Sequence, residues 1–426
     1  MSLVTRARQV RMSLRYLRRM ANGRRKVLAH LRAPVADNLP MPTFVQLRLT
    51  NMCNLRCKMC GQWGDTGVYR ERSDVGDGEQ ERRRIKELIG LKRQLSLSDY
   101  TRLLDELAPH EPVISLFGGE PFLYPDILPL IHEVKRRKLT LNVITHGGLL
   151  ERHARELVES GIDSISVSFD GPPDLHNHIR GQATSFQNAA AGVRALAEWR
   201  KRLGQGTPVL LAIFPLTELN FAEADAGIQS LRELPLDIIN VGLRWFVPPE
   251  AGARYEQVMN EAFGVSATSW RGFEFSWAQT ATSERQLADL ARFLKTLRRR
   301  HLFGWSTGPH VSFLPDVKAD DVPAYFTEPS RTFGHNLCPV AWYFAQVEPD
   351  GEVCFCGDFP DYSIGNVRRE TFRDIWTGEK AGTFRRKLAQ EPLPICARCC
   401  GNFVYGRWTR PDQRTAPGGG TPPSIG

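Results

Sequence analysis

The sequence predicts an α/β fold of parallel βα units, followed by a smaller cysteine-rich domain. Two observations support this prediction. Between residues 44 and 246, six apolar segments with strand character alternate with amphipathic helical segments, a pattern typical of a parallel sheet covered by helices. All nine cysteines lie in two groups, residues 53–60 and 338–400. In a reducing compartment, such grouping indicates metal ligation rather than disulfide bonds.

The strands and helices of the first region can be placed from periodicity. The predicted strands are residues 44–50, 113–117, 139–145, 164–169, 209–214 and 238–246. Apolar residues recur three and four positions apart in residues 100–107, 127–134 and 186–197, which predicts helices there. Because parallel strands end at the same edge of a sheet, functional groups are expected at their carboxyl ends.

The composition is that of a globular protein. The chain has 426 residues, of which 42% are hydrophobic and 24% charged. It shows no apolar run of membrane-spanning length and no secretory signal, so we expect a cytoplasmic location. The net charge of +9 comes from residues 1–32, which carry ten Lys/Arg and no Asp/Glu. The rest has 46 basic and 47 acidic residues, which argues against a nucleic-acid partner.

Three thiols follow the first strand at spacing C-x3-C-x2-C: Cys53, Cys57 and Cys60. Three thiolates can hold a four-iron cubane and leave one iron open to a non-protein ligand. A structural zinc site needs four ligands, and a disulfide framework belongs to small secreted chains. The alternatives to a [4Fe-4S] cluster therefore fit less well.

This loop resembles the signature of the radical S-adenosylmethionine (SAM) superfamily, although Met59 stands where relatives usually have an aromatic residue. The resemblance implies a partial (β/α)6 TIM-like barrel. It also implies that the open iron binds SAM, that one electron cleaves SAM, and that a 5'-deoxyadenosyl radical then removes hydrogen from a substrate. A flavodoxin or ferredoxin-type protein is the expected electron donor.

Two further segments resemble SAM-binding motifs of this family. Gly118, Gly119 and Glu120 follow the second strand; glycines permit close approach of a ligand, and a carboxylate can accept hydrogen bonds from an ammonium group. The resemblance implies that Glu120 holds the SAM amino group. It further implies that Ser168 and Asp170 approach the SAM ribose or the substrate, and that Arg180 approaches the SAM carboxylate. Asp170 could instead cap a turn or a helix.

The sequence does not identify a catalytic residue, but three side chains are candidates. His146 ends the third strand, where relatives often have asparagine; it could transfer a proton or only fill the place of that asparagine. Asp170 is the second candidate. Arg244 ends the sixth strand and could bind a substrate anion or form an internal salt bridge.

The second cysteine group has Cys338, Cys354, Cys396 and Cys399 as expected ligands, with Cys356 and Cys400 as substitutes. Four thiolates with a C-x2-C pair fit zinc when taken alone. However, the order of cysteine, Pro-Asp-Gly turn, cysteine, Ile-Gly-Asn, short helix and C-x2-C resembles the auxiliary-cluster domain of SPASM/twitch radical SAM enzymes. The resemblance implies a second [4Fe-4S] cluster. Since four thiolates leave no iron open, this auxiliary cluster should carry electrons.

Five parts are predicted along the chain. They are a basic helical arm (1–43), a core barrel (44–247), a bridging region (248–337), the small Fe-S cluster domain (338–408) and a disordered tail (409–426). The arm has apolar residues at helical spacing among arginines, which fits peripheral membrane contact, a partner-binding helix or packing on the barrel. The charged insertion at residues 64–94 is a loop or a lid.

The main functional hypothesis is a radical SAM enzyme that abstracts hydrogen from a biosynthetic intermediate, with oxidation or rearrangement assisted by the auxiliary cluster. The alternative is a peptide- or protein-modifying enzyme, of the RiPP-maturation or sulfatase-maturase type. A third hypothesis, from a different class, is a non-catalytic iron–sulfur electron carrier. Such a carrier would have no use for the two SAM-binding motifs, and absence of SAM binding would identify it.

Overall fold

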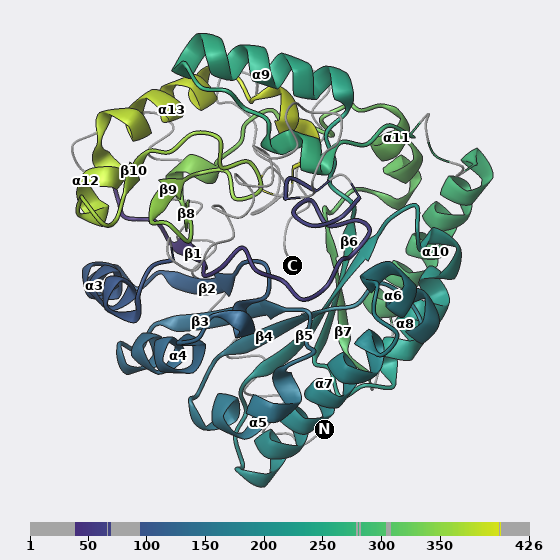
Figure 1. The fold of residues 1–426 in the computed structure, drawn as a ribbon. Helices are drawn as coiled ribbons and strands as arrows, with labels where there is room; N and C mark the ends of the chain where they lie inside the picture. The colour runs from purple at the N-terminus through teal and green to yellow at the C-terminus, as the bar shows by residue number, and fades with distance from the viewer. Residues whose placement is uncertain are drawn as a thin grey trace, which may run out of the picture.

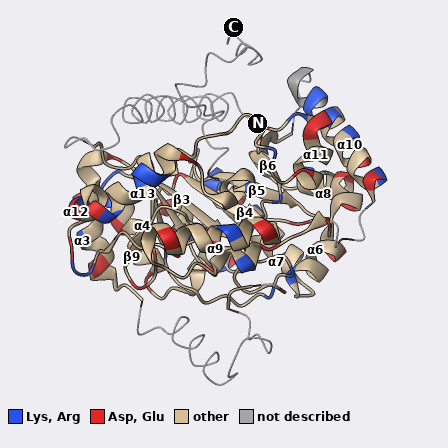
Figure 2. Ribbon diagram, turned by 90° about the horizontal axis from the view of Figure 1, so that it is seen from above, with Lys and Arg blue, Asp and Glu red and all other residues tan. Residues whose placement is uncertain are grey.

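The computed structural model describes residues 39–65, 67–69, 94–277, 280, 283–303, 308–399 and 401. Nearly all of the predicted basic arm, most of the 64–94 insertion, Cys400 and the predicted tail lie outside these residues. Within the described part, no helix is long and apolar enough to cross a membrane. Lys and Arg are intermixed with Asp and Glu over the described helices (Figure 2).

One ten-stranded sheet in the order β10-β9-β8-β1-β2-β3-β4-β5-β6-β7 organises the molecule (Figure 1). Neighbouring strands from β8 through β1 to β7 pair in parallel, whereas β8-β9 and β9-β10 pair antiparallel. The strands are β1 (Phe44–Arg48), β2 (Val113–Phe117), β3 (Thr140–Thr145), β4 (Ser164–Ser168), β5 (Val209–Leu216), β6 (Ile238–Leu243), β7 (His310–Leu314), β8 (Phe344–Val347), β9 (Glu352–Cys354) and β10 (Gly365–Asn366). The predicted α/β fold with a parallel, partly closed barrel is confirmed.

The sequence analysis missed a seventh barrel strand. β7 lies within the region that was interpreted as a bridge, and it pairs in parallel with β6. Only Val311 of its five residues is fully buried. β1, β2 and β4 also have five residues, but β7 buries only one of its own, so it lacks the buried apolar pattern of the other six strands.

Helices cover the convex face of the sheet, and the concave face looks toward the centre of the molecule (Figure 1). The helices are α3 (Leu97–Leu107), α4 (Ile127–Arg136), α5 (Leu150–Glu159), α6 (Pro173–Arg180), α7 (Ser185–Arg202), α8 (Ala224–Arg232), α9 (Pro249–Phe263), α10 (Glu284–Phe303), α11 (Val322–Thr327), α12 (Phe372–Thr377) and α13 (Glu379–Gln390). Local sequence sets their ends. Ser96 and Asp99 form a capping box at the start of α3, and Gly181 ends α6 with a φ of 69°.

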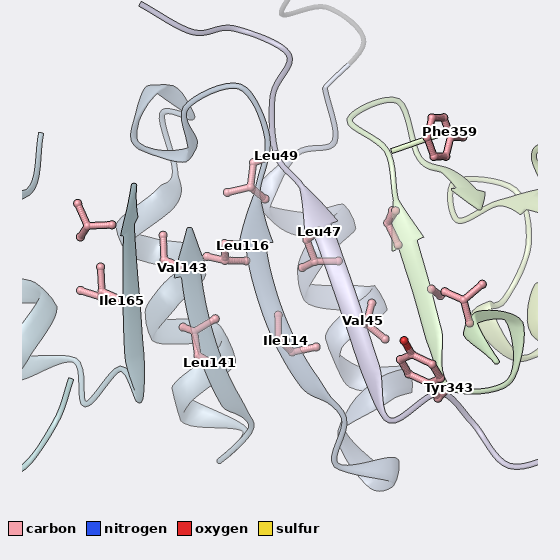
Figure 3. Packing of buried hydrophobic residues seen from close by; sticks show 14 of the residues in the cluster. Val45, Leu47, Leu49, Ile114, Leu116, Leu141, Val143, Ile165, Tyr343 and Phe359 are labelled. Atoms are coloured by element: carbon pink, nitrogen blue, oxygen red, sulfur yellow. The ribbon is translucent and has the colours of Figure 1, made fainter. Parts of the chain in front are cut away.

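Strand alternation separates an apolar face from a polar one. Leu47, Leu116 and Val143 are fully buried on the helix-covered face, where their side chains lie side by side (Figure 3). Each such side chain contributes roughly 1.5–3 kcal/mol through burial. The alternate residues, among them Gln46 and Asn142, face the other way and are half-buried. The concave face therefore carries the hydrogen-bonding groups.

The cysteine-rich C-terminal region continues the same sheet. β8 pairs with β1, and the rings of Phe44 and Phe344 stack at 5.8 Å between centroids. Trp376 of α12 donates its indole N–H to Pro40 O at 3.0 Å. The C-terminal region is thus joined to the barrel through main-chain hydrogen bonds as well as side-chain packing.

Candidate functional site

The Cys53–Cys60 loop follows the carboxyl end of β1, and none of its three cysteines is in a disulfide bond. Each sulfur accepts an N–H hydrogen bond: Cys53 Sγ from Leu55 N at 3.4 Å, Cys60 Sγ from Gln62 N at 3.4 Å, and Cys57 Sγ from Arg180 Nη1 at 3.7 Å. Hydrogen bonds to sulfur are one of the ways in which a protein tunes an iron–sulfur cluster. The donor set and its N–H partners fit such a cluster.

Burial controls the protonation of these thiols. It raises the pKa of Cys53 to about 12 and that of Cys57 to about 11, although the Arg180 guanidinium partly opposes the second shift. Both groups are therefore protonated in the metal-free chain, and metal binding must release their protons. Within the described ranges, no three Cys, His, Asp or Glu side chains are close enough to hold a single metal ion. In a cubane, by contrast, each thiolate binds its own iron.

Gly118 and Gly119 allow the end of β2 to touch the chain that leads into the cysteine loop. A Cβ on Gly118, whose φ is 151°, would lie 2.5 Å from Thr50 O, and one on Gly119 would lie 2.1 Å from Met52 O. The amides of Gly119 and Glu120 donate to these same two carbonyls, each at 2.7 Å. The two glycines were expected to permit the close approach of a ligand. In the structure they permit the close approach of the main chain at Thr50 and Met52. It places Glu120 beside the loop.

Glu120 is fully buried and accepts hydrogen bonds from three groups. Its donors are Phe122 N at 3.1 Å, Thr145 Oγ1 at 2.8 Å and His146 N at 3.0 Å. Because two carboxylate oxygens offer about four lone-pair positions, Glu120 keeps capacity for one further donor.

His146 connects Glu120 to the cysteine loop. Gly148 N donates to its Nδ1 at 3.0 Å, so the proton lies on Nε2. Nε2 then donates to Asn54 Oδ1 at 2.8 Å and lies 3.2 Å from Glu120 Oε2. Burial lowers the pKa of His146 and outweighs the effect of Glu120. The neutral ring thus holds Asn54 and the loop in place, which agrees with a histidine in the position of an asparagine.

Asp170 and Arg180 form a buried pair beside Cys57. The guanidinium bonds both carboxylate oxygens, with Arg180 Nη2 3.0 Å from Asp170 Oδ1. Burial alone would lower the pKa of Arg180, but Asp170 and the nearby Cys57 thiol raise it above its ordinary value. Lys58 N also donates to Ile179 O at 2.9 Å. The end of α6 is therefore fixed to the cysteine loop.

Groups that the sequence analysis did not select hold Asp170 in place. Its amide donates to His176 Nδ1 at 3.1 Å, and its carbonyl accepts from Asn220 Nδ2 at 2.8 Å. His176 is fully buried and is not a solvated turn residue. A histidine six residues after an aspartate gives no periodic signal, so this contact was not predictable. Ser168 ends β4 half-buried on the concave face, close in sequence to this group.

Arg244 forms the internal salt bridge that was one of its two predicted roles. Its guanidinium pairs with Glu218 Oε1 and lies over the Phe275 ring at 4.5 Å from the centroid. The other oxygen, Glu218 Oε2, is buried and has no hydrogen-bond partner among the described residues. With this arrangement Arg244 is already neutralised in the protein.

Four thiols of the C-terminal region gather at one place, and Cys356 is one of them. Cys338 and Cys396 are hydrogen-bonded to each other. Burial raises the pKa of Cys356 well above its usual value, and the nearby Cys338 and Cys399 raise it further. The thiols at 338, 356, 396 and 399 are therefore near one another in the described part of the chain.

Cys354 is also near Cys356, and its Sγ donates to Cys356 O at 3.6 Å, but its other neighbours differ. On β9 it pairs with Gln346 of β8, and its pKa is raised by burial and then by Glu348. Cys354 was the expected ligand because the resemblance places a cysteine there, and Cys356 was its substitute because a regular strand would place both on one side. However, β9 ends at Cys354, so strand alternation does not reach Cys356. Cys400 lies outside the described residues.

Comparisons with known proteins agree with this geometry. Residues 47–223 match the sequence model of the radical SAM superfamily, and residues 338–400 match that of SPASM, an iron–sulfur cluster-binding domain. The chain is 25% identical over 422 residues to Fe-coproporphyrin III synthase of Methanosarcina barkeri, with 91% of this chain and 90% of the relative covered. It is 26% identical over 381 residues to PqqA peptide cyclase of Ruegeria pomeroyi, with 86% of this chain and 82% of the relative covered. The solved structure of anSMEcpe with bound AdoMet and Cp18Cys peptide shares the fold, with a TM-score of 0.52, 15% identity, and 86% and 88% of the two chains covered.

Proposed function

Because this chain is a radical SAM superfamily enzyme with a C-terminal SPASM iron–sulfur domain, we propose that it cleaves SAM reductively and abstracts hydrogen from a biosynthetic intermediate. The observation that carries the proposal is the cysteine loop, in which each of three thiols accepts an N–H hydrogen bond. A [4Fe-4S] cluster bound there would supply the electron that generates the 5'-deoxyadenosyl radical. The match to both family models makes a non-catalytic electron carrier the weaker hypothesis.

Two groups of side chains next to the loop are proposed to hold SAM. The spare lone pair of Glu120 would accept from the SAM ammonium group, and Gly118 and Gly119 keep that carboxylate beside the loop. Arg180 would face the SAM carboxylate while Asp170 holds its guanidinium at Cys57. Ser168 is proposed to meet the ribose or the substrate. Their roles in this chain rest on their positions around the loop.

The second cluster is proposed to be held by Cys338, Cys356, Cys396 and Cys399. The proximity of these four thiols supports this set. The set expected from the sequence contained Cys354 in place of Cys356, and it is less favoured because Cys354 lies against Glu348. With four protein ligands, the auxiliary [4Fe-4S] cluster would take up or supply an electron during oxidation or rearrangement of the substrate. A flavodoxin or ferredoxin-type donor, a cytoplasmic location and membrane contact by the N-terminal arm stay predictions.

Peptide modification is the second candidate function. The relative from Ruegeria pomeroyi is a peptide cyclase, and the anSMEcpe structure contains a bound peptide. The relative from Methanosarcina barkeri, in contrast, is named for a tetrapyrrole product. These names fit both candidates, so the substrate class must be inferred from the interior of the barrel.

SAM cleavage is the direct test. Anaerobically reconstituted protein, reduced with dithionite and supplied with SAM, should form 5'-deoxyadenosine and methionine. Formation of S-adenosylhomocysteine as the only product would show methyl transfer and refute the proposal. If no SAM binds at all, the electron-carrier hypothesis would replace it.

A further inference from the structure

The concave face of the sheet carries an uncharged row of hydrogen-bonding side chains that the proposed chemistry does not use. Direct strand pairing aligns Cys354 with Gln346, Gln346 with Gln46, Gln46 with Ser115, Ser115 with Asn142, and Asn142 with Ser164. Directly opposed residues point to the same face of a sheet. We call these six residues the polar belt.

Internal hydrogen bonds lock one half of the polar belt. Asn142 Oδ1 accepts from Ser164 Oγ at 3.0 Å and from Ser166 Oγ at 3.1 Å, while Asn142 Nδ2 reaches Ser115 Oγ at 3.5 Å. This half is satisfied within the protein.

The other half of the belt is held in place but left with unused groups. Gln346 is fully buried, and its amide nitrogen donates to Gly357 O at 2.8 Å and to Glu348 Oε1. Its Oε1 nevertheless has no hydrogen-bond partner among the described residues. A buried acceptor without a partner is uncommon, because desolvation is then uncompensated. Such an atom indicates a missing partner.

Arg48 has the same property, and Gly357 closes the region from the other side. Arg48, two residues after Gln46 on β1, donates to Glu348 Oε2 and to Tyr69 OH, both at 3.2 Å. Its Nε is buried without a partner within the described part of the chain. Gly357 also brings the backbone so near that a Cβ there would lie 2.9 Å from Gln346 Oε1 and 3.5 Å from Gln46 Oε1. The oxygens of both carboxamides thus lie beside Gly357, and that of Gln346 has no partner among the described residues.

Charge limits what can occupy this region. Beside Gln346, Glu348 already neutralises Arg48. A ligand carboxylate at the belt would therefore meet a paired arginine and carboxamide oxygens, and burying it there is costly. An uncharged group that both donates and accepts hydrogen bonds would suit the same atoms.

We infer that the polar belt binds an uncharged carboxamide or hydroxyl group of the substrate, and that the substrate is not a polycarboxylate. This inference rests on the proposed function and adds a substrate class to it. Gln46 lies four residues before Thr50, and a strand rises about 3.3 Å per residue, so the belt would hold a part of the substrate about 13 Å from Thr50, which precedes the cysteine loop. The shared chemistry occurs in neutral peptides and in polyols or glycosides.

Binding measurements can test the inference without any turnover. The reconstituted full-length protein with bound SAM would be titrated by calorimetry with three kinds of probe: N-acetylated peptide amides containing Asn, Gln or Ser; methyl glycosides; and coproporphyrin III as a polycarboxylate. We expect one neutral class to bind and coproporphyrin III not to bind. Which neutral class binds distinguishes a peptide source from a glycoside source.

Two variants then locate the binding. Gln346→Met and Gln46→Met keep the side-chain length and remove the hydrogen-bonding groups, and each should weaken the neutral probe about tenfold. Gln257→Met on α9 is the matched control, because Gln257 is exposed and bonds only Glu261 among the described residues. This control should bind the probe as the wild type does. Melting temperatures and iron content show whether each variant folds.

Several results would overturn the inference. They are tight binding of coproporphyrin III, failure of every neutral probe to bind the wild type, or unchanged probe affinity in both folded Met variants. If Gln46→Met lowers only the melting temperature, the two glutamines satisfy each other and no ligand is needed. Failure of the proposed function would look different, because the wild type would then not cleave SAM.

Discussion

Replacing Cys354 and Cys356 by alanine, one at a time, can show which of the two is a ligand of the auxiliary cluster. Cys356→Ala removes a thiol that lies with Cys338 and Cys399, whereas Cys354→Ala removes one that lies against Glu348. The two positions are two residues apart; Cys354 is buried and Cys356 is half-buried. Each variant is therefore the matched control of the other.

The expected magnitude follows from the number of ligands. Two cubanes correspond to about eight irons per chain, and a cubane that loses one of four thiolates becomes labile. Cys356→Ala should then retain about four irons, those of the SAM cluster, while Cys354→Ala should retain about eight. Truncating a buried cysteine also leaves a small cavity, which costs on the order of 1 kcal/mol in either variant.

The assay is iron and sulfide content per chain after anaerobic reconstitution, followed by SAM cleavage under dithionite. Both variants should still form 5'-deoxyadenosine, since the cysteine loop is intact. If Cys354→Ala loses four irons and Cys356→Ala loses none, the ligand assignment derived from the structure is wrong. Stoichiometric zinc with about four irons in the wild type would instead make the C-terminal region a structural zinc site.

Three further predictions concern the barrel. Cys57→Ala removes one of three ligands of the SAM cluster, so 5'-deoxyadenosine formation should disappear while the roughly four irons of the auxiliary cluster remain. Residual cleavage of SAM would contradict the proposed ligand set. Glu120→Gln should weaken SAM by roughly 1.5–3 kcal/mol in equilibrium binding and lower the melting temperature, because an amide group would face Phe122 N or His146 N; unchanged affinity would leave Glu120 a purely structural role. Burial lowers the pKa of His176 to about 4, so its contribution to stability is present above pH about 6.5 and is lost as the pH falls toward 4. At pH 5.5 the loss should be about 1.4 kcal/mol in urea unfolding, and His176→Gln should show a smaller decrease between pH 7.5 and 5.5; equal decreases would exclude His176 as the source.

Local patterns in the sequence predicted much of this fold. The second strand has the predicted bounds, Val113–Phe117, because four apolar residues and one serine stand between clear helical and turn signals. The position of the three motifs around the barrel edge also followed from strand order. The pairing of β8 with β1 did not, since it joins residues about 300 positions apart, and no local pattern specifies such a partner.

Some features of the candidate site could likewise be predicted from the sequence, and others could not. The cysteine loop, Glu120 and Arg180 were predicted from spacing and resemblance, and the structure brings them together. The contacts that hold them, from Asn54 to His146 and from Asn220 to Asp170, involve single polar residues without periodicity. The end of β9 at Cys354 is one reason for proposing Cys356 as the ligand, and strand ends are the least predictable feature of a sequence.

The pairing of β8 with β1 has a consequence for any attempt to divide this protein. With β8 in place, β1 is an interior strand with neighbours on both sides. A chain shortened before residue 338 would turn β1 into an open edge, with unpaired amides and carbonyls next to the cysteine loop. Exposed edges of this kind recruit strands from other molecules. We therefore expect the isolated barrel to aggregate, even though its own helices and hydrophobic core would be complete.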